Sequence, residues 1–581
     1  MKRRYILAIL SVVIAIALGS CGKSFLSIAP VGSLSQDVLA TEAGCNAEVV
    51  GVYAMVDGKT SQNGWGWGAT AINWIYGDIR AAMASKGSDE GDQPYINSIQ
   101  TYSESATNDY LNMQWKMLYE GVARANSAII IINKAVANNA LTQDKADLLL
   151  EQVKALRGWF HFQAWRMWAG KVPYLDETTD YTTVTNSEDI SDKILADLTE
   201  GTKLPLNMTQ IGRFNKTVCE IILAKAMMQM KHDYAGALTL LNDAKATGKK
   251  PNGGDIGLNP TYGDIFDPAD RNGLESIYTI QYSVNDGSGA ANAGYDACLN
   301  FPYTTGPGTC CGFYCPTQEF VNSFRTSGGL PLLDATYNTG ANQVVNDLGL
   351  AQADPFTPDA GPLDPRLDWS VGRRGIPYWD WGLMTGINWI RKQSYSGPYC
   401  TKKQVYKKSE ASTFVDGSGW TGGQMGNGYK MIRYSELLLL IAECQIETND
   451  LTDAFTNINL VRARAANPAG FVQNLDGTAP AANYVINEYP SASAFPFDSQ
   501  ANARIALQME RKLELGMEGQ RWFDLNRWGI TKTEINRILA YMKTLPNGPD
   551  LYGSSTAGDN CNKFPIPQRQ IDLSNGNLVQ N

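Results

Sequence analysis

"RYSELLLLIAECQIETNDLTDAFTNINLVRARAA", residues 433–466, decides the fold class of this chain. Apolar side chains recur at helical spacing in two runs, Ile432–Thr448 and Leu451–Ala466, and the motif NPAG ends the second run. Ala442 lies 12 residues before Ala454. The small residues of the two helices in a tetratricopeptide repeat have the same spacing. Small residues at these positions let paired helices approach closely, so the stretch predicts a helix pair of this type.

The second-helix spacing of that repeat occurs twice. It is seen in Leu451, Ala454, Ile458 and Val461, and again in Tyr234, Ala237, Leu241 and Ala244, before Pro251. Apolar periodicity predicts further helices over Asn108–Asn138, Thr142–Trp168, Ser187–Leu204, Lys216–Lys231, Tyr234–Thr247 and Asp498–Leu515. Between Pro251 and Met431, glycine, proline, asparagine and aromatic residues replace the helical period. We expect a mainly α fold, a tetratricopeptide-like scaffold of helical pairs with a large loop-rich, partly β insertion.

The N-terminus has the layout of an export signal. Lys2, Arg3 and Arg4 precede an apolar run, Ile6–Leu18, of 13 residues, whereas a membrane-spanning helix needs about 20. The run closes on Leu-Gly-Ser before Cys21, which resembles a bacterial lipobox. We expect residues 1–20 to be removed and Cys21 to carry acyl chains that anchor the protein to a membrane. The alternative is an ordinary secretory signal with a chance cysteine.

Composition excludes several classes of function. The net charge is -9 and the pI is near 5.1, which argues against nucleic-acid binding because that function needs a basic surface. His161 and His232 are the only histidines, which removes most metal sites and most Ser-His or Cys-His catalytic arrangements. Nucleophile-elbow, P-loop and dinucleotide-binding motifs are absent. The sequence therefore indicates no catalytic residue, no metal and no cofactor.

Acidic residues alone do not indicate an enzyme. A glycosidase needs two carboxylates about 5 to 10 Å apart, but 58 Asp and Glu residues make candidate pairs unavoidable. The densest acidic loop, "GSDEGD" with Asp89, Glu90 and Asp92, has the composition of a solvated turn and could also hold calcium. We expect binding without chemistry.

Eight of the ten cysteines fall into two groups. Cys219 and Cys444 lie in apolar helical stretches and are expected in the core. Loop-like sequence contains six more: Cys298, Cys310, Cys311, Cys315, Cys400 and Cys561. An oxidising exterior permits pairing, and "CCGFYC" lacks the second Cys/His pair of a metal knuckle. We predict one or two disulfides here.

Several blocks of sequence resemble the SusD/RagB family of surface lipoproteins. The specific blocks are "RYSELLLLIAECQIE" (Arg433–Glu447), "ERKLELGMEGQRWFDLNRWG" (Glu510–Gly529) and the ending "FPIPQRQIDLSNGNLVQN". "LDPRLDWSVGRRGIPY" and "CCGFYCPTQEFVNSF" resemble a long-headed subgroup. The resemblance implies a SusD-like α/α superhelix and a lipid anchor on the outer surface. It also implies a partner, a SusC-like TonB-dependent outer-membrane barrel over which the protein closes as a lid. Most members studied bind glycans, and some bind oligopeptides.

We expect four regions along the chain: the signal peptide at 1–20, an N-terminal SusD-like helical region at 21–250, a ligand-facing insertion at 251–431, and a C-terminal SusD/RagB helical region at 432–581. Residues 21–581 are expected to form one structural unit.

The ligand site is argued from chemistry, because the shared blocks do not contain the family's glycan residues. Sugars present C–H faces that stack on aromatic rings and hydroxyl groups that need amide, carboxylate or guanidinium partners. "NGWGWGATAINWIYGDIR" supplies Trp65, Trp67, Trp74, Tyr76, Asp78 and Arg80. Residues two apart on extended chain face the same way, so Trp65 and Trp67 could form one platform.

A second aromatic cluster lies in the insertion and comprises Tyr303, Phe313, Tyr314, Trp379 and Trp389. For both clusters the alternative is that these rings fill the core of a loop-rich head. Aromatic residues on the amphipathic helices, such as Trp159, Trp168 and Trp522, are instead expected in the core.

The sequence thus predicts a glycan-binding lipoprotein of the outer membrane, exposed at the cell surface and anchored through Cys21. A neutral oligosaccharide is favoured, since an acidic chain repels a polyanion. The alternatives are an oligopeptide-binding RagB-like lipoprotein, a carbohydrate-active enzyme, and a surface adhesin without a transporter.

Overall fold

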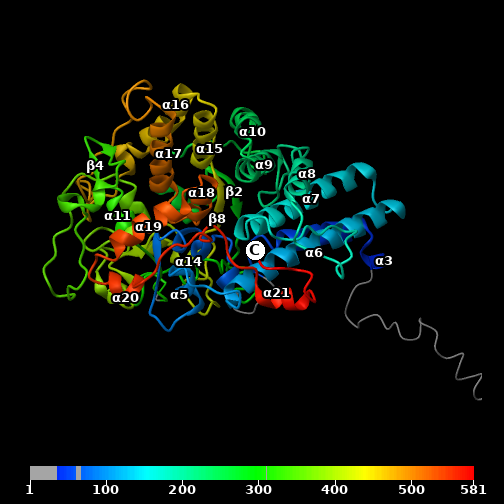
Figure 1. The fold of residues 1–581 in the computed structure, drawn as a ribbon, viewed down its shortest axis with the longest axis horizontal. Coiled ribbons are helices and arrows are strands. Elements are labelled where there is room, and N and C mark those ends of the chain that lie inside the picture. The colour runs from blue at the N-terminus through cyan, green and yellow to red at the C-terminus, as the bar shows by residue number, and fades with distance from the viewer. Residues whose placement is uncertain (1–35, 60–66, 309) are drawn as a thin grey trace, which may run out of the picture.

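The computed structural model describes residues 36–59, 67–308 and 310–581 (Figure 1). The predicted signal peptide, Cys21 and Trp65 lie outside the described residues. Within these ranges, no helix has both the length and the apolar character needed to cross a membrane.

The N-terminal half is a series of helices packed on their neighbours in chain order. Its elements are α3 (Gln36–Leu39), α4 (Glu42–Tyr53), α5 (Tyr95–Gln100), α6 (Asp109–Ala137), α7 (Gln143–Met167), α8 (Ser191–Gly201), α9 (Lys216–Lys231) and α10 (Tyr234–Thr247). From α6 to α10 each helix contacts the next. Gly121 of α6 allows this closeness, because a Cβ there would lie 2.6 Å from the Phe160 ring of α7.

The predicted C-terminal helix pair is confirmed. It consists of α15 (Tyr434–Glu447) and α16 (Leu451–Ala465), with α17 (Gln500–Leu515) packed on both. Ala442 and Ala454 are fully buried in the apolar cluster that these three helices share. Because α15 also contacts α10, it joins the two helical halves, as Figure 1 shows. Helix α15 begins two residues later than expected, since Ile432 and Arg433 end a strand.

Strands occur only in short antiparallel pairs within the described residues. The pairs are β1 (Ala84–Gly87) with β3 (Phe313–Pro316), β2 (Ser276–Ile280) with β8 (Tyr429–Arg433), β4 (Thr326–Ser327) with β5 (Leu330–Pro331), and β6 (Val371–Gly372) with β7 (Cys400–Thr401). The first pair fastens the N-terminal region to the head, residues 251–431. The expected mainly α fold with a loop-rich, partly β insertion is confirmed.

The remaining elements are short or C-terminal. The α-helices are α11 (Gln318–Asn322), α12 (Leu367–Ser370), α13 (Gln393–Ser396), α14 (Ala411–Phe414), α18 (Arg521–Arg527), α19 (Thr531–Met542), α20 (Gly548–Tyr552) and α21 (Gln568–Leu573). Single turns of other helix types are η1 (Trp67–Ala69), η2 (Trp74–Ile79), η3 (Gly263–Phe266), η4 (Pro268–Asp270), η5 (Thr336–Asn338), η6 (Gly340–Asn342), η7 (Ile387–Trp389), η8 (Lys408–Glu410) and η9 (Pro468–Gly470).

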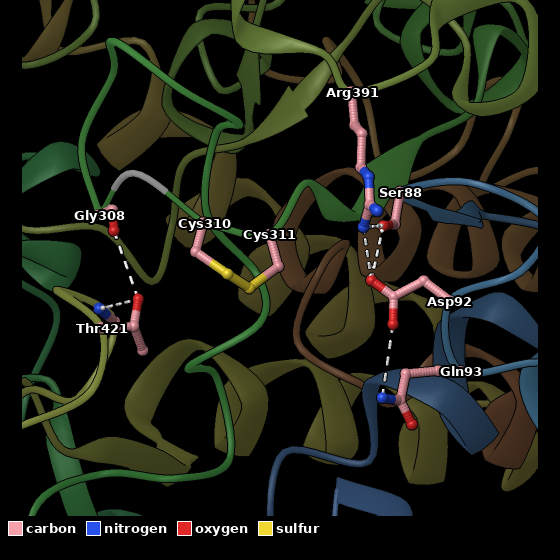
Figure 2. Close-up of a disulfide and its surroundings, with 9 residues drawn as sticks. Ser88, Asp92, Gln93, Gly308, Cys310, Cys311, Arg391 and Thr421 are labelled. Carbon is pink, nitrogen blue, oxygen red and sulfur yellow. Dashed lines mark hydrogen bonds and ion pairs between the residues drawn. A yellow bond between two sulfur atoms is a disulfide. The ribbon is translucent and has the colours of Figure 1, made fainter.

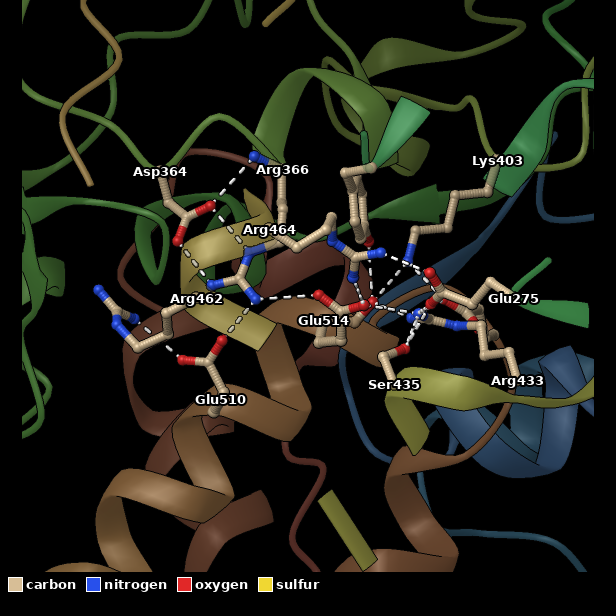
Figure 3. A network of polar contacts seen from close by, with 12 residues as sticks. Glu275, Asp364, Arg366, Lys403, Arg433, Ser435, Arg462, Arg464, Glu510 and Glu514 are labelled. Carbon is tan, nitrogen blue, oxygen red and sulfur yellow. Dashed lines mark hydrogen bonds and ion pairs between the residues drawn. The ribbon is translucent and has the colours of Figure 1, made fainter. Parts of the chain in front are cut away.

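A buried network of charges connects the head to the C-terminal helices (Figure 3). Glu510 of α17 accepts from Arg366 of the head at 2.6 Å and from Arg462 of α16 at 2.9 Å. Glu514, one helical turn further, accepts from Arg366 at 3.0 Å and also contacts Arg433 and Arg464. All these side chains are buried. The network therefore holds the head, helix α16 and helix α17 in one arrangement.

Candidate functional site

Three aromatic side chains meet at the surface of the head. Trp67 in η1 is half-buried and stacks on Tyr295, with ring centroids 5.8 Å apart and ring planes 4° apart. The edge of Trp420 approaches Trp67 at 6.3 Å, and Trp420 is 46% exposed. We call Trp67, Tyr295 and Trp420 the aromatic platform. The predicted partner of Trp67 in such a platform, Trp65, lies outside the described residues.

Two glycines let the backbone hold this platform. A Cβ at Gly68 would lie 2.8 Å from the ring of Tyr110, so only glycine lets η1 pack this closely on α6. A Cβ at Gly294 would lie 2.9 Å from the ring of Tyr282. The Gly294 N–H donates to the carbonyl of Met425 at 2.8 Å, which fixes the segment that presents the neighbouring Tyr295.

A disulfide joins Cys310 and Cys311 of the head, and Figure 2 shows it between the contact of Thr421 with Gly308 and the side chain of Arg391. On one side, the Thr421 hydroxyl donates to the carbonyl of Gly308 at 3.3 Å. On the other side, a Cβ at Gly312 would lie 3.3 Å from Tyr303 and 3.5 Å from Arg391. The prediction of a disulfide among the loop cysteines is confirmed by this pair. The other seven cysteines in the described ranges, Cys219 and Cys444 among them, are buried and unpaired.

Charged groups surround Tyr303. The Arg391 guanidinium lies 5.5 Å from the centre of the Tyr303 ring, and Tyr303 is half-buried. Arg391 donates to the Asp92 carboxylate at 2.6 Å and to the Ser88 hydroxyl at 2.8 Å, as Figure 2 shows. It also pairs with Asp89 at 2.8 Å. These groups give the surface beside the disulfide both donors and acceptors.

The acidic loop of residues 87–92 is bound by the ammonium group of the preceding residue, Lys86. The Lys86 ammonium donates to the backbone carbonyls of Asp89 and Asp92, both at 2.7 Å, and burial lowers the pKa of Lys86 to about 8. Lys392 pairs with Glu90 at the surface. No group of three or more possible metal ligands occurs among the residues that the structure describes. The loop is thus ordered by lysine and arginine side chains.

Seven of the aromatic and polar residues proposed as ligand contacts lie in the core instead. They are Trp74, Tyr76, Asp78, Arg80, Phe313, Tyr314 and Trp389, each at most 3% exposed. The ring of Trp74 packs against those of Phe313 and Tyr314 at 6.1 and 5.7 Å. These contacts follow from the pairing of β1 with β3, which brings Trp74 of the first predicted cluster against Phe313 and Tyr314 of the second and covers these rings. These seven residues therefore fill the core, which was the alternative expectation for both clusters.

The polar members of that group have partners inside the protein. The Asp78 carboxylate accepts from the Tyr314 hydroxyl at 2.5 Å and from the Gly519 N–H at 2.9 Å. Arg80 pairs with Glu104 at 2.7 Å. Burial raises the pKa of Asp78. A carboxylate and a guanidinium that are already paired in the interior are unavailable to a ligand at the surface.

Trp379, the remaining predicted residue, lies in a different place from the aromatic platform. Its half-buried ring meets that of Trp369 edge to face, with centroids 5.1 Å apart. Both rings line a groove that shares no residue with the platform.

Sequence reasoning missed Tyr295 and Trp420. Trp420 stands in "GSGWTGG", a large aromatic among glycines, which is the same local signal that singled out Trp67. Tyr295 stands in "NAGYDAC" and had no comparable signal.

Comparison with known proteins identifies the family. A model described as "SusD family" matches residues 274–581, which is more than half of the chain. The chain belongs to the SusD family. A second model, described as "Starch-binding associating with outer membrane", matches residues 73–226 of this SusD-family chain.

Relatives and solved structures of similar proteins cover nearly the whole chain. SusD-like protein P2 of Formosa agariphila is 23% identical over 98% of this chain and 98% of its own length. Among solved structures, surface glycan-binding protein A from Bacteroides thetaiotaomicron, in complex with laminarihexaose, is 21% identical with a TM-score of 0.64. The match covers 93% of this chain and 99% of that one. A laminarin-binding SusD-like protein is 17% identical with a TM-score of 0.60, covering 93% and 99%. These structures confirm the SusD-like fold, and family membership places the chain among binding proteins rather than enzymes.

Proposed function

We propose that this protein captures a neutral oligosaccharide at the cell surface on the aromatic platform. The observation that carries the proposal is the stacking of Trp67 on Tyr295 beside the exposed ring of Trp420. Two proteins of similar structure bind laminarihexaose and laminarin, which makes laminari-oligosaccharides the first probes.

The platform supplies what a sugar needs for binding. The exposed ring of Trp420 offers an apolar face for the C–H groups of a hexose. Arg391, Asp92 and Ser88 lie beyond the disulfide, and their donors and acceptors suit hydroxyl groups. The net charge of -9 disfavours an acidic polysaccharide.

We further propose that the protein is anchored to the outer membrane through Cys21 and acts as the lid of a SusC-like TonB-dependent transporter. The lipobox-like sequence supports the anchor. Membership of the SusD family and the match to a model of proteins associating with the outer membrane support the partner.

The test is binding of the soluble body, residues 22–581, to a glycan array, followed by titration calorimetry with laminarihexaose or another neutral oligosaccharide that the array reveals. Trp420→Ala removes one exposed ring and should weaken binding about tenfold, since an aromatic contact contributes about 1 kcal/mol or somewhat more. Trp67→Ala should weaken it at least as much.

Tyr181→Ala is the matched control, because Tyr181 is a 59% exposed aromatic far along the chain in the α7–α8 connection. It should leave the affinity unchanged. If the protein binds no glycan but binds peptides from a library, the proposed oligosaccharide ligand is wrong and the oligopeptide alternative takes its place. Full affinity in the Trp420 variant would show that the aromatic platform is not the binding site.

A further inference from the structure

A groove beside the head combines four segments that are distant in the sequence. Its walls come from residues 261–267, 369–382 and 402–407 of the head and from residues 469–475, which begin within η9. Trp369 of α12 and Trp379 form one corner of the groove, with their rings at 61° to each other. Both side chains are half-buried, so each keeps part of its surface open to the groove.

Trp369 is fixed as a rigid wall of this groove. Its indole N–H donates to the carbonyl of Gly470 at 2.7 Å, and the Lys402 ammonium lies 5.0 Å from the ring centre. Gly263 lies against the same ring, because a Cβ there would be 2.5 Å from it. A ring held in this way loses little conformational entropy when a ligand stacks on it.

Trp379 has two unfavourable features. Its φ of 48° lies in the left-handed region, which a bulky side chain rarely adopts. Its indole nitrogen is buried and has no hydrogen-bond partner among the described residues. Outliers of both kinds collect at functional sites, where the surrounding structure holds them in place. Part of the Trp379 ring packs against the buried cluster of Tyr262, Ile265 and Phe266, and the ring also lines the groove.

Polar groups beside the rings match the edge of a sugar. Asp264 and Asp380 are exposed carboxylates on the groove, and Gln473 and Asn474 add amides from the opposite loop. Asp380 is held by the Ser409 N–H at 2.9 Å. Lys407 pairs with Asp267 and lies 5.8 Å from the Trp379 ring, which removes a free positive charge from the groove. The combination of aromatic rings, carboxylates and amides is that of an oligosaccharide site.

We propose that this groove is a second oligosaccharide-binding site, separate from the aromatic platform. The inference rests on the proposed glycan-binding function. The two sites share no lining residue. The half-buried ring of Trp381 contacts the buried ring of Tyr406, which contacts the buried ring of Phe301, and these contacts connect the regions that carry the two sites. Two sites on one rigid body hold a polysaccharide chain more tightly than either alone, because binding at one site raises the effective concentration at the other.

The experiment separates the two sites with a double variant, Trp67→Ala/Trp420→Ala, which removes the platform. The soluble body is titrated with laminarihexaose, or with the neutral oligosaccharide that the array selects. The wild type should show two sites, and the double variant should keep one weak site. Adding Asp264→Ala or Trp379→Phe should weaken that remaining site at least fivefold. Asp264 is exposed and Phe retains a ring, so neither change threatens the fold, which melting curves verify.

A spectroscopic readout makes the assignment direct. In protein labelled with 5-fluorotryptophan, the fluorine signal missing from Trp379→Phe belongs to Trp379. This signal should shift when the oligosaccharide is added to the platform variant, and Tyr181→Ala should change nothing. Wild-type binding with a single site, lost entirely in the platform variant while the Trp379 signal stays fixed, would overturn the second site and leave the proposed function standing. No binding by the wild type to any neutral glycan would instead overturn the proposed function.

Discussion

At the scale of single residues, Asp296 stands out because it is a buried carboxyl without a cationic partner among the residues that the structure describes. It accepts from the Tyr282 hydroxyl at 2.8 Å and from the Ala297 N–H at 2.9 Å. Burial raises its pKa to about 7, and the nearby Asp57 carboxylate adds to the shift. The residue follows Tyr295 of the aromatic platform, so its protonation affects the part of the head that holds that ring.

The first prediction concerns the pH dependence of stability. The folded state binds the Asp296 proton more tightly than the unfolded state, whose pKa is near 3.9. The contribution of Asp296 to the free energy of unfolding should therefore fall as pH rises from about 4 to about 7 and then level off. Asp296→Asn, which mimics the protonated form, should match the wild type near pH 4 and be more stable than it at pH 8. Urea unfolding at both pH values measures this, and a difference between the proteins that does not vary with pH would contradict it.

At the scale of elements, the buried network of Figure 3 determines how α15, α16, α17 and the head fit together. Glu514 is fully buried and contacts three arginines, Arg366, Arg433 and Arg464. These guanidinium groups hold the pKa of Glu514 well below its usual range.

Removing Glu514 should destabilise the protein strongly. Glu514→Ala leaves buried guanidinium groups without one of their carboxylates, and breaking a buried pair in this way costs about 3 to 5 kcal/mol. The matched control is Arg504→Ala on the same helix, which breaks a half-exposed pair with Glu447 and should cost about 1 kcal/mol or less. Denaturant unfolding compares the two, and equal losses would show that the network does not provide this coupling.

The helices were predictable from sequence because their signals are local. The bounds of α9 and α10 agree with the expectation residue for residue, and side chains before each helix cap it: Asn215 accepts from the Val218 N–H at 3.0 Å, and Asp233 from the Gly236 N–H at 2.9 Å. The proposed binding surface was only partly predictable. Trp67 and Trp74 lie in the same aromatic loop, but strand β3, which covers Trp74, comes from residues 313–316. That burial depends on a contact between distant segments, which no local pattern indicates.

At the scale of the whole molecule, the helices form a frame and the head carries most of the two proposed ligand surfaces. The helical series from α6 to α10 and the pair α15–α16 form the frame, while the aromatic platform and the groove both lie on or beside the head. The frame explains the matches to SusD-family structures at about 20% identity, since helix packing tolerates substitution that keeps volume and pattern. The two proposed ligand surfaces depend on individual loop residues, which can differ among relatives with the same fold.

The last prediction concerns attachment and partner. If Cys21 carries the acyl anchor, Cys21→Ala should move the protein from the membrane fraction to the soluble fraction, because no helix in the described ranges could hold it there. The same variant should keep the glycan affinity of the wild type, since the platform lies in the folded body. From outer membranes solubilised in mild detergent, the wild type should co-purify with a TonB-dependent barrel, and the variant should be depleted from that complex because it is no longer concentrated at the membrane. Retention of the variant in the membrane would refute the anchor, and a wild type that always purifies alone would refute the lid.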